Sequence, residues 1–178
     1  MNIDKITIGE NAPHEINVII ENPLGTTNVK YELDKDSGAL YVDRFRLASM
    51  SYPGNYGFVP HTLSLDGDPI DVLVVSDLAV AHKAVLPCKP VGVLLMEDDG
   101  GIDEKIIAIA SPRLAPVRRN VEEYTDLEEG RLERIKHFFT HYKDGEKGKW
   151  VKINGWGNAE QARKLIEESI ARARTKAE

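Results

Sequence analysis

The stretch that most limits how this chain can fold is DGDPIDVLVV (66–75), in which an acidic turn leads directly into an apolar strand. Asp66, Asp68 and Asp71 lie within six positions, separated by a glycine and a proline that both favour turns. The apolar run that follows is typical of a strand buried within a sheet. Three carboxylates are therefore held at the entrance to the core, where like charges repel unless something compensates for them.

Three interpretations of this acidic turn are open from the residues alone. It could be a solvated surface turn, because aspartate, glycine and proline all occur in turns. A calcium loop of the EF-hand type fits poorly, since Asp71 stands where that loop needs glycine and a strand follows in place of a helix. The third is a magnesium site, because crowded carboxylates are hard oxygen ligands and a divalent cation offsets their repulsion.

The rest of the chain has the pattern of short strands followed by two helices. Apolar residues that alternate with polar ones, or run continuously, predict strands over 15–21, 28–33, 39–45, 71–75, 85–96 and 105–110, with a hairpin loop at 98–101. Helical spacing predicts helices over 127–143 and 158–174, the second opened by a capping box of Asn158 and Gln161. This order predicts an α+β protein whose strands are most simply closed as a small barrel.

Composition narrows the functional class. A length of 178 residues suits one domain over 1–178, and 42% apolar residues are enough for a core. The net charge of −6 provides no basic footprint for duplex nucleic acid, so no nucleic-acid partner is expected. With no apolar run of the ~18 residues that span a membrane and no signal-peptide core, the expected location is the cytoplasm, with no membrane partner. The single cysteine, Cys88, is expected to be a buried thiol.

Further acids and cations can converge on the DGDPID turn. Alternation places Lys30 and Glu32 on one face of their strand, and Glu21 ends the preceding strand. If these strands pair as a meander, the three side chains could approach the same mouth of the barrel. A second acidic loop, EDDGGIDEK (97–105), lies beyond an intervening strand. Side chains able to bind phosphate are Arg44, Tyr52, Tyr56, Tyr142, Lys143, Lys147 and Lys149. Taken singly, each tyrosine would be a packing residue and each lysine solvated; together with the acids they predict a site for a metal-bound polyphosphate.

The motif D-x-D-P-apolar-D-apolar in DGDPIDV (66–72) resembles that of the soluble family I inorganic pyrophosphatases, and the length resembles their bacterial branch. Matching context runs through VKYELDKDSGALYVDRF, YPGNYGFVPHTLSLDGDPIDVLV, VGVLLMEDDGGIDEK and HFFTHYKDGEKGKWVKINGW. The resemblance implies a closed, five-stranded, OB-like barrel flanked by two C-terminal helices. It also implies magnesium-dependent hydrolysis of inorganic diphosphate to two phosphates by direct attack of a metal-activated water, with several Mg²⁺ ions per site, a place in phosphate metabolism, and a homohexamer.

The resemblance further implies a role for each position of the motifs. Asp68 would be the general base toward the nucleophilic water. The metal ligands would be Asp66, Asp71, Asp98, Asp103, Glu21 and Glu32, the two glutamates acting largely through water. The substrate would be held by Lys30, Arg44, Tyr56, Tyr142 and Lys143, supported by Tyr52 and Lys105. Asp99 stands beside Asp98, so the sequence leaves open which of the two is the ligand.

The competing class is a non-enzymatic binding module. OB-like barrels commonly bind single-stranded nucleic acid or other polyanions through a basic groove and stacked aromatic side chains. Only 7% of this chain is aromatic and its net charge is negative, which argues against such a groove. Metal-independent oligonucleotide binding without phosphate release would favour this alternative.

Two histidines, His137 and His141, lie one helical turn apart in HFFTHY. They predict either a contact between subunits or two surface histidines near a helix end. A zinc pair is also conceivable, although the glutamate of an HExxH motif is missing.

Overall fold

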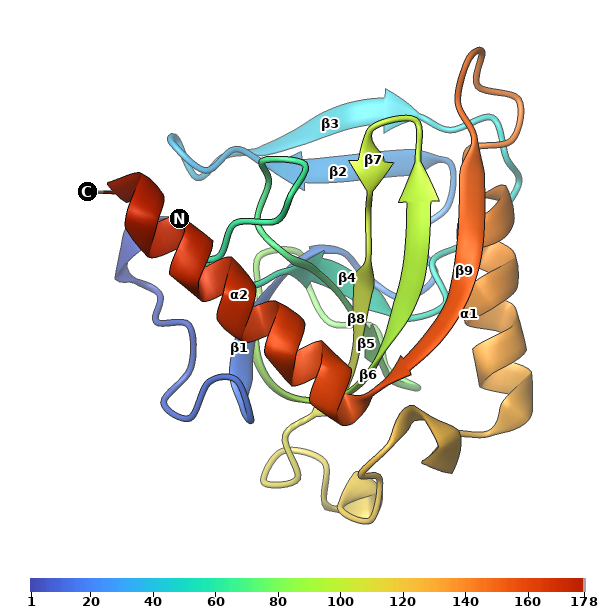
Figure 1. Cartoon of the computed structure of the whole chain (residues 1–178). Coiled ribbons are helices and arrows are strands. Elements are labelled where there is room, and N and C mark those ends of the chain that lie inside the picture. Colours follow the sequence, from blue (N-terminus) through green and yellow to red (C-terminus); the bar gives the residue numbers. More distant parts are fainter. Residues whose placement is uncertain (178) are drawn as a thin grey trace.

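The computed structural model describes residues 1–177 and consists of a mixed seven-stranded sheet, a separate two-stranded sheet and two long helices (Figure 1). The strands are β1 (Ile16–Asn22), β2 (Val29–Leu33), β3 (Leu40–Phe45), β4 (Asn55–Phe58), β5 (Asp71–Val75), β6 (Val85–Asp98), β7 (Gly101–Ile102), β8 (Lys105–Ala110) and β9 (Val151–Asn158). The helices are α1 (Glu129–His141) and α2 (Ala159–Ala177), and short 3₁₀ turns span Ile3–Lys5, Pro116–Arg118 and Tyr124–Asp126.

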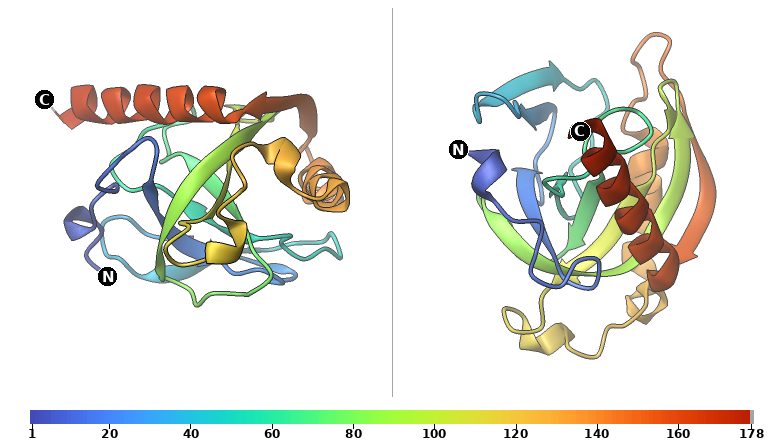
Figure 2. Two further views of the ribbon diagram at one scale, coloured as in Figure 1. Left: turned by 90° about the horizontal axis from the view of Figure 1, so that it is seen from below. Right: turned by 60° about the vertical axis from the view of Figure 1, so that its left-hand side comes forward.

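The main sheet is organised around the long strand β6. The strand order is β1-β4-β5-β8-β6-β7, with β9 also beside β6 and with β1 pairing β6 as well as β4. β5 and β8 run parallel, and the other pairs of this sheet are antiparallel. Figure 2 shows β6 curving around the core, which lets one strand contact partners at both ends of the sheet.

The predicted α+β class with two C-terminal helices is confirmed, whereas the predicted closed five-stranded barrel is correct only in part. The sheet is mixed and has seven strands, because β7 and β9 extend it beyond β6. The expectation that β1, β2 and β3 pair as a meander is wrong, since β2 and β3 form a sheet of their own. Alternation identifies the residues that share a face, but it does not identify the strand that pairs with them.

The six predicted strands and the hairpin loop at 98–101 are confirmed, but the sequence does not predict the short strand β7 after that loop, nor β4 and β9. The segment NYGF of β4 follows Pro53 and Gly54, which indicate a turn. β9 reads VKINGWGN, and its glycines and asparagines are depleted in strands. Both segments become strands through long-range pairing, β9 with residues 92–98 of β6.

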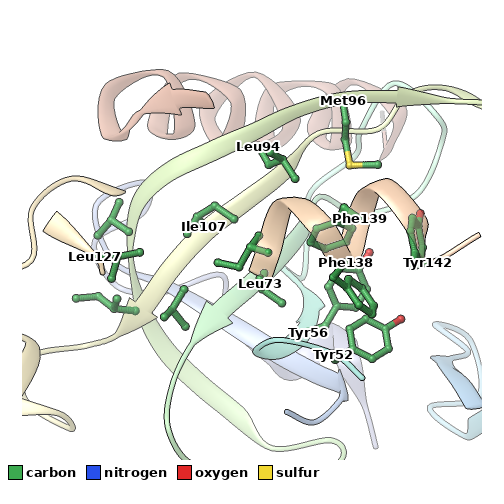
Figure 3. Close-up of a cluster of buried hydrophobic side chains, with 14 residues drawn as sticks. Tyr52, Tyr56, Leu73, Leu94, Met96, Ile107, Leu127, Phe138, Phe139 and Tyr142 are labelled. Atoms are coloured by element: carbon green, nitrogen blue, oxygen red, sulfur yellow. The ribbon is translucent and has the colours of Figure 1, made fainter. Parts of the chain in front are cut away.

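The two helices cover different parts of the sheet (Figures 1 and 2). α1 packs on β9 and buries Ile135, Phe138 and Phe139 in an aromatic cluster, part of which Figure 3 shows. α2 packs on β6 and buries Ala162 and Ile166 in a second apolar cluster. Both helices are predicted by their apolar spacing.

The predicted capping box of α2 is confirmed. The Gln161 amide N–H donates to Asn158 Oδ1 at 2.9 Å, and the Asn158 amide N–H donates to Gln161 Oε1 at 3.0 Å. Cys88 is buried as predicted, and burial raises the pKa of its thiol well above the usual range. Over residues 1–177, no helix is both long and apolar enough to cross a membrane.

Candidate active site

The DGDPID turn is fastened at the entrance to β5 by the side chain of Thr62. The Thr62 hydroxyl donates to the Val59 carbonyl at 2.6 Å and accepts the Ile70 N–H at 3.0 Å, so it joins both sides of the loop. Within the turn, the Asp68 N–H donates to Asp66 Oδ1 at 3.1 Å. These bonds hold the carboxylates of the turn next to the first residue of β5.

Seven of the predicted site residues line one small cavity of about 70 Å³. They are Glu21, Lys30, Glu32, Tyr56, Asp66, Asp68 and Asp71, and they are joined by Lys35, Phe58 and Pro69. These residues come from β1, β2, β4, β5 and the two adjoining turns. Segments that are far apart in the sequence therefore converge at one end of the main sheet, beneath the β2–β3 hairpin (Figure 1).

A larger cavity of about 560 Å³ lies elsewhere, between α1 and residues 49–53. It is lined in part by Tyr52, but it contains none of the predicted carboxylates. A small, highly charged ligand needs converging charges more than volume. We therefore take the smaller acidic cavity as the candidate active site.

Lys105 compensates for two carboxylates at this site. Its Nζ lies 2.6 Å from Asp71 Oδ2 and also contacts Asp103 Oδ1, and the residue is only 2% exposed. Burial opposes the charged ammonium, but Asp71 and Asp103 together raise the Lys105 pKa well above its usual value. An ammonium group thus stands between two of the predicted metal ligands. In this arrangement of residues 1–177, no three His, Cys, Asp or Glu side chains are grouped to hold a metal ion directly.

Asp98 and Asp99 point to different surroundings. Asp98 is buried and contacts the Lys143 ammonium, whereas Asp99 is an exposed residue whose carboxylate lies 2.5 Å from Lys149 Nζ. Burial acts to raise the Asp98 pKa, but bonds from Lys143 and the Gly100 amide lower it overall. The Lys149 ammonium lowers the Asp99 pKa to about 2. Asp99 Oδ1 also lies 3.4 Å from Lys143 Nζ, so both carboxylates face that ammonium and Asp98 is the more buried of the two.

The three predicted tyrosines lie together in the aromatic cluster of α1 (Figure 3). Tyr56 lines the acidic cavity, whereas Tyr52 lines the larger one. The rings of Tyr52 and Tyr56 stack with centroids 5.2 Å apart, and Tyr142 packs against Phe138 and Phe139. Burial is the main cause that raises the pKa of all three phenols. Their hydroxyl groups stay protonated and can donate hydrogen bonds to an anion.

The remaining predicted cations lie on the β2–β3 hairpin. Lys30 Nζ is 3.0 Å from Asp43 Oδ2 and 3.6 Å from Glu32 Oε2. Arg44 Nη1 lies 3.5 Å from Glu146 Oε2, and the buried Arg44 Nε has no hydrogen-bond partner among residues 1–177. Arg44 therefore keeps donor capacity for a ligand, which suits phosphate oxygens.

Lys35 and Glu146 are site residues that the sequence does not predict. Lys35 lines the cavity, with its Nζ 3.8 Å from Glu21 Oε1 and 3.7 Å from Glu32 Oε1. It lies in the turn after β2, where alternation carries no information about direction. Glu146 lies in the lysine-rich segment HYKDGEKGKW, and its contact with Arg44 depends on how that loop meets the hairpin.

The acids at the site carry a charge that the protein alone does not fully offset. Burial raises the Glu21 pKa to about 7. Burial also raises the pKa values of Asp66 and Asp103, and in both cases the Asp71 carboxylate adds to the increase. A divalent cation would relieve this cost, and carboxylate oxygens are the ligands that Mg²⁺ prefers. The donor set therefore fits a hard divalent metal.

We expect the Glu21→Gln variant to change how stability depends on pH in magnesium-free buffer. The folded-state pKa of Glu21 is raised from 4.5 to about 7. Its contribution to stability is therefore fully present below pH 4.5 and is lost as the pH rises through 7. Glutamine cannot ionise. The free energy of unfolding of the variant, minus that of the native chain, should therefore increase by about 2 to 3 kcal/mol from pH 5 to pH 8. Denaturant unfolding measures this gain, and the same difference at both pH values would contradict the raised pKa.

The charges at this cavity suit one kind of ligand. Carboxylates whose negative charge is not balanced by the protein bind cations, while the ammonium, guanidinium and phenol groups near them bind anions. A polyanion that arrives with divalent cations satisfies both sets at once. The fold and the cavity thus define the class, a metal-dependent site for phosphate anions.

Comparison with known proteins narrows this class to one family. The family model described as inorganic pyrophosphatase matches residues 18–174. A protein of Agrobacterium fabrum named inorganic pyrophosphatase is 56% identical over 175 residues, covering 98% of this chain and 99% of that protein. Its counterpart in Brucella melitensis is 57% identical over 176 residues, covering 99% and 100%. The chain belongs to the inorganic pyrophosphatase family.

Solved structures agree with this assignment. The inorganic pyrophosphatase of Helicobacter pylori superimposes with a TM-score of 0.91 at 46% identity, covering 96% of this chain and 99% of that one. The inorganic pyrophosphatase of Thermus thermophilus superimposes with a TM-score of 0.90 at 38% identity, covering 98% and 99%. The mixed sheet with two helices is therefore shared over nearly the whole length of these chains.

Proposed function

We propose that this protein is a magnesium-dependent inorganic diphosphatase that hydrolyses pyrophosphate to two phosphates. The observation that carries the proposal is the convergence of the DGDPID carboxylates with Lys30 and Tyr56 in one cavity of a chain that belongs to this family. Relatives that are 56–57% identical over nearly the full chain are named for the same activity.

The acidic residues would hold the metal ions. The six proposed ligands are Glu21, Glu32, Asp66, Asp71, Asp98 and Asp103. Four of them, Glu21, Glu32, Asp66 and Asp71, line the cavity, and Asp103 shares the Lys105 ammonium with Asp71, which supports this assignment. When bound, Mg²⁺ neutralises phosphate charge and makes water a better nucleophile near neutral pH. Before magnesium binds, the Lys105 ammonium holds Asp71 and Asp103 together, and so the protein keeps these two ligands close without the metal.

Asp68 would accept the proton of the attacking water. It lines the cavity and is exposed, so its carboxylate is accessible to water. The water oxygen forms a bond to one phosphorus atom, the bond from that phosphorus to the bridging oxygen breaks, and the proton goes to the Asp68 carboxylate. No covalent intermediate with a side chain is needed.

Cations and phenols would bind the two phosphoryl groups. The proposed contacts are Lys30, Arg44, Tyr56, Tyr142 and Lys143, supported by Tyr52 and Lys105. These donors are held in place by strands and by α1, so they can stabilise the charge that develops on the leaving phosphate. The buried phenols add neutral donors without adding further positive charge.

The decisive test is phosphate release from pyrophosphate by the purified chain. We expect release with Mg²⁺ and its loss when Mg²⁺ is removed by a chelator. Oligonucleotide binding that needs no metal, without phosphate release, would instead support the binding-module alternative. Absence of phosphate release with saturating Mg²⁺ would overturn the proposal.

We expect Asp71→Asn to require roughly 10- to 100-fold more Mg²⁺ for half-maximal activity, because it removes one charged ligand. The measurement is initial rate against Mg²⁺ concentration at saturating pyrophosphate. Asp36→Asn, at an exposed position in the turn between β2 and β3, serves as the control and should keep the native dependence. An unchanged Mg²⁺ dependence in Asp71→Asn would remove Asp71 from the ligand set.

We also propose that the chain forms a homohexamer and works in the cytoplasm, as the family resemblance implies. On α1, His137 is exposed and His141 is half-buried, with ring centroids 4.7 Å apart. His141 Nδ1 lies 2.8 Å from Asp144 Oδ2, so His137 is the more accessible of the two for a neighbouring subunit. Light scattering should give six times the mass of one chain, and the mass of a single chain would contradict the assembly. Cell fractionation tests the location.

We further propose that the main sheet has an OB-like arrangement of strands. Support comes from β1, which pairs with β4 on one side and with β6 on the other. Through β5 and β8, these pairings connect five strands around one core.

A further inference from the structure

The hairpin of β2 and β3 carries three of the proposed site residues, Lys30, Glu32 and Arg44, yet it lies outside the main sheet. Figure 1 shows it above the end of the sheet at which the acidic cavity lies. Within residues 1–177, its two strands pair only with each other. The position of these side chains over the cavity must therefore be set by contacts other than a β ladder.

A bulge in β1 supplies such contacts. Consecutive side chains of a regular strand point to opposite faces. The register between β1 and β4 shifts between Ile20 and Asn22, which makes Glu21 an extra residue on β1. A bulge of this kind redirects side chains. As a result both Glu21 and Asn22 reach β2, and Glu21 Oε1 accepts the Leu33 N–H at 2.7 Å.

Asn22 binds the middle of β2 with both halves of its amide. Its Nδ2 donates to the Tyr31 carbonyl at 2.8 Å, and the Tyr31 N–H donates to its Oδ1 at 2.9 Å. The Asn22 residue is completely buried. Loss of either bond would therefore leave an unpaired polar group in the interior. The two hydrogen bonds of the Asn22 side-chain amide take the place of the backbone ladder bonds that paired strands would share, because β1 and β2 are not paired.

We propose that Asn22 is a positioning residue that sets where Lys30 and Glu32 stand over the cavity. Tyr31 lies between these two residues in the sequence. Holding the Tyr31 backbone therefore also holds the neighbouring backbone from which the side chains of Lys30 and Glu32 extend. An asparagine offers a donor and an acceptor in one plane, whereas aspartate lacks the donor and leucine lacks both. The kinetic part of this inference rests on the proposed function.

Asn55 provides a matched control within the same chain. It is also completely buried, and its Oδ1 accepts the N–H groups of Leu24 and Val80, both at 3.0 Å. Its Nδ2 donates to the Leu78 carbonyl at 2.9 Å. Asn55 thus ties two loops together without a side-chain bond to β2. Loss of the side-chain amide removes two hydrogen bonds at Asn22 and three at Asn55, but of these two asparagines only Asn22 bonds β2.

The test compares the native chain with Asn22→Leu, Asn22→Asp and Asn55→Leu below their unfolding temperatures. It measures KM and kcat for pyrophosphate at saturating Mg²⁺, together with hydrogen exchange at the amides of residues 29–33. Asn22→Leu should lower kcat/KM roughly 10- to 100-fold through displaced side chains. It should also speed exchange at Tyr31 and Leu33. Asn22→Asp should show a smaller loss because it keeps the bond to the Tyr31 N–H.

Asn55→Leu should lower the unfolding temperature while KM and exchange at residues 29–33 stay native. Native kinetics and exchange in Asn22→Leu, or equal losses in Asn55→Leu, would overturn the inference. If Asn22→Leu does not fold, Asn22→Asp decides by the same two measurements, and native values there would also overturn it. If the native chain released no phosphate, the proposed function would fail, whereas the exchange measurements would still decide whether Asn22 holds the hairpin.

Discussion

The Asp68→Asn variant should fold normally and lose roughly 10²- to 10⁴-fold in turnover of pyrophosphate, which is the range for removal of a general base. Asparagine has nearly the same shape as aspartate, so the turn should persist. Asp68 joins the turn through its backbone, whose N–H bonds Asp66 Oδ1 and whose carbonyl accepts the Ser64 N–H at 2.7 Å. The substitution therefore removes the proton acceptor while leaving these bonds in place.

The measurement for Asp68→Asn is the steady-state rate from pH 6 to pH 9 at saturating Mg²⁺. Unfolding temperature and Mg²⁺ dependence, measured alongside, should stay native because the proposed ligands are intact. Asp36→Asn, at an exposed aspartate that does not line the cavity, is the matched control and should retain full turnover. Native-like turnover of Asp68→Asn across this range would show that another group accepts the proton.

The Lys105→Met variant should lose about 3 to 5 kcal/mol of stability in metal-free buffer, the usual cost of removing one partner of a buried ion pair. Methionine keeps most of the side-chain volume, so the loss reports charge more than packing. Without the ammonium, Asp71 and Asp103 repel each other in a buried setting. Magnesium should recover part of the loss, since a divalent cation can take over the compensation.

Denaturant unfolding of Lys105→Met with chelator and with Mg²⁺ measures both effects. Lys152→Met is the control, because Lys152 is 65% exposed and its pair with Glu97 lies at the surface. Exposed pairs contribute about 0 to 1 kcal/mol, so this variant should stay close to native in either buffer. An equal, small loss in the two variants would show that Lys105 does not compensate for the acids.

Local features of the site could be predicted from the sequence because they depend on neighbouring residues. The turn at 66–71 is specified by glycine and proline, and the buried strand after it by its apolar run. The placement of Lys30 and Glu32 on one face follows from the two-residue period of a strand. The structure accordingly brings these residues together with Glu21 in one cavity.

Long-range features could not be predicted because they depend on strand register. Asp71 and Lys105 are neighbours because β5 and β8 run parallel with Val72 opposite Ile106, and no local pattern indicates that pairing. The role of Asn22 depends on a bulge in β1, which exists only relative to β4. The family resemblance predicts Lys105 only as a supporting residue near the substrate. Its ion pairs with Asp71 and Asp103, like the hydrogen bonds of Asn22, are visible only in the folded chain.

The many partners of β6 affect how this protein is made. β6 pairs with β1 near the start of the chain and with β9 near its end, for example Cys88 with Ile16 and Gly92 with Asn158. Such distant pairings form slowly, because the entropy cost of closing a long loop comes before any stabilising hydrogen bond can form. During synthesis, residues 92–98 of β6 lack their β9 partner until residues 151–158 leave the ribosome. We therefore expect the nascent chain to be prone to aggregation until β9 docks.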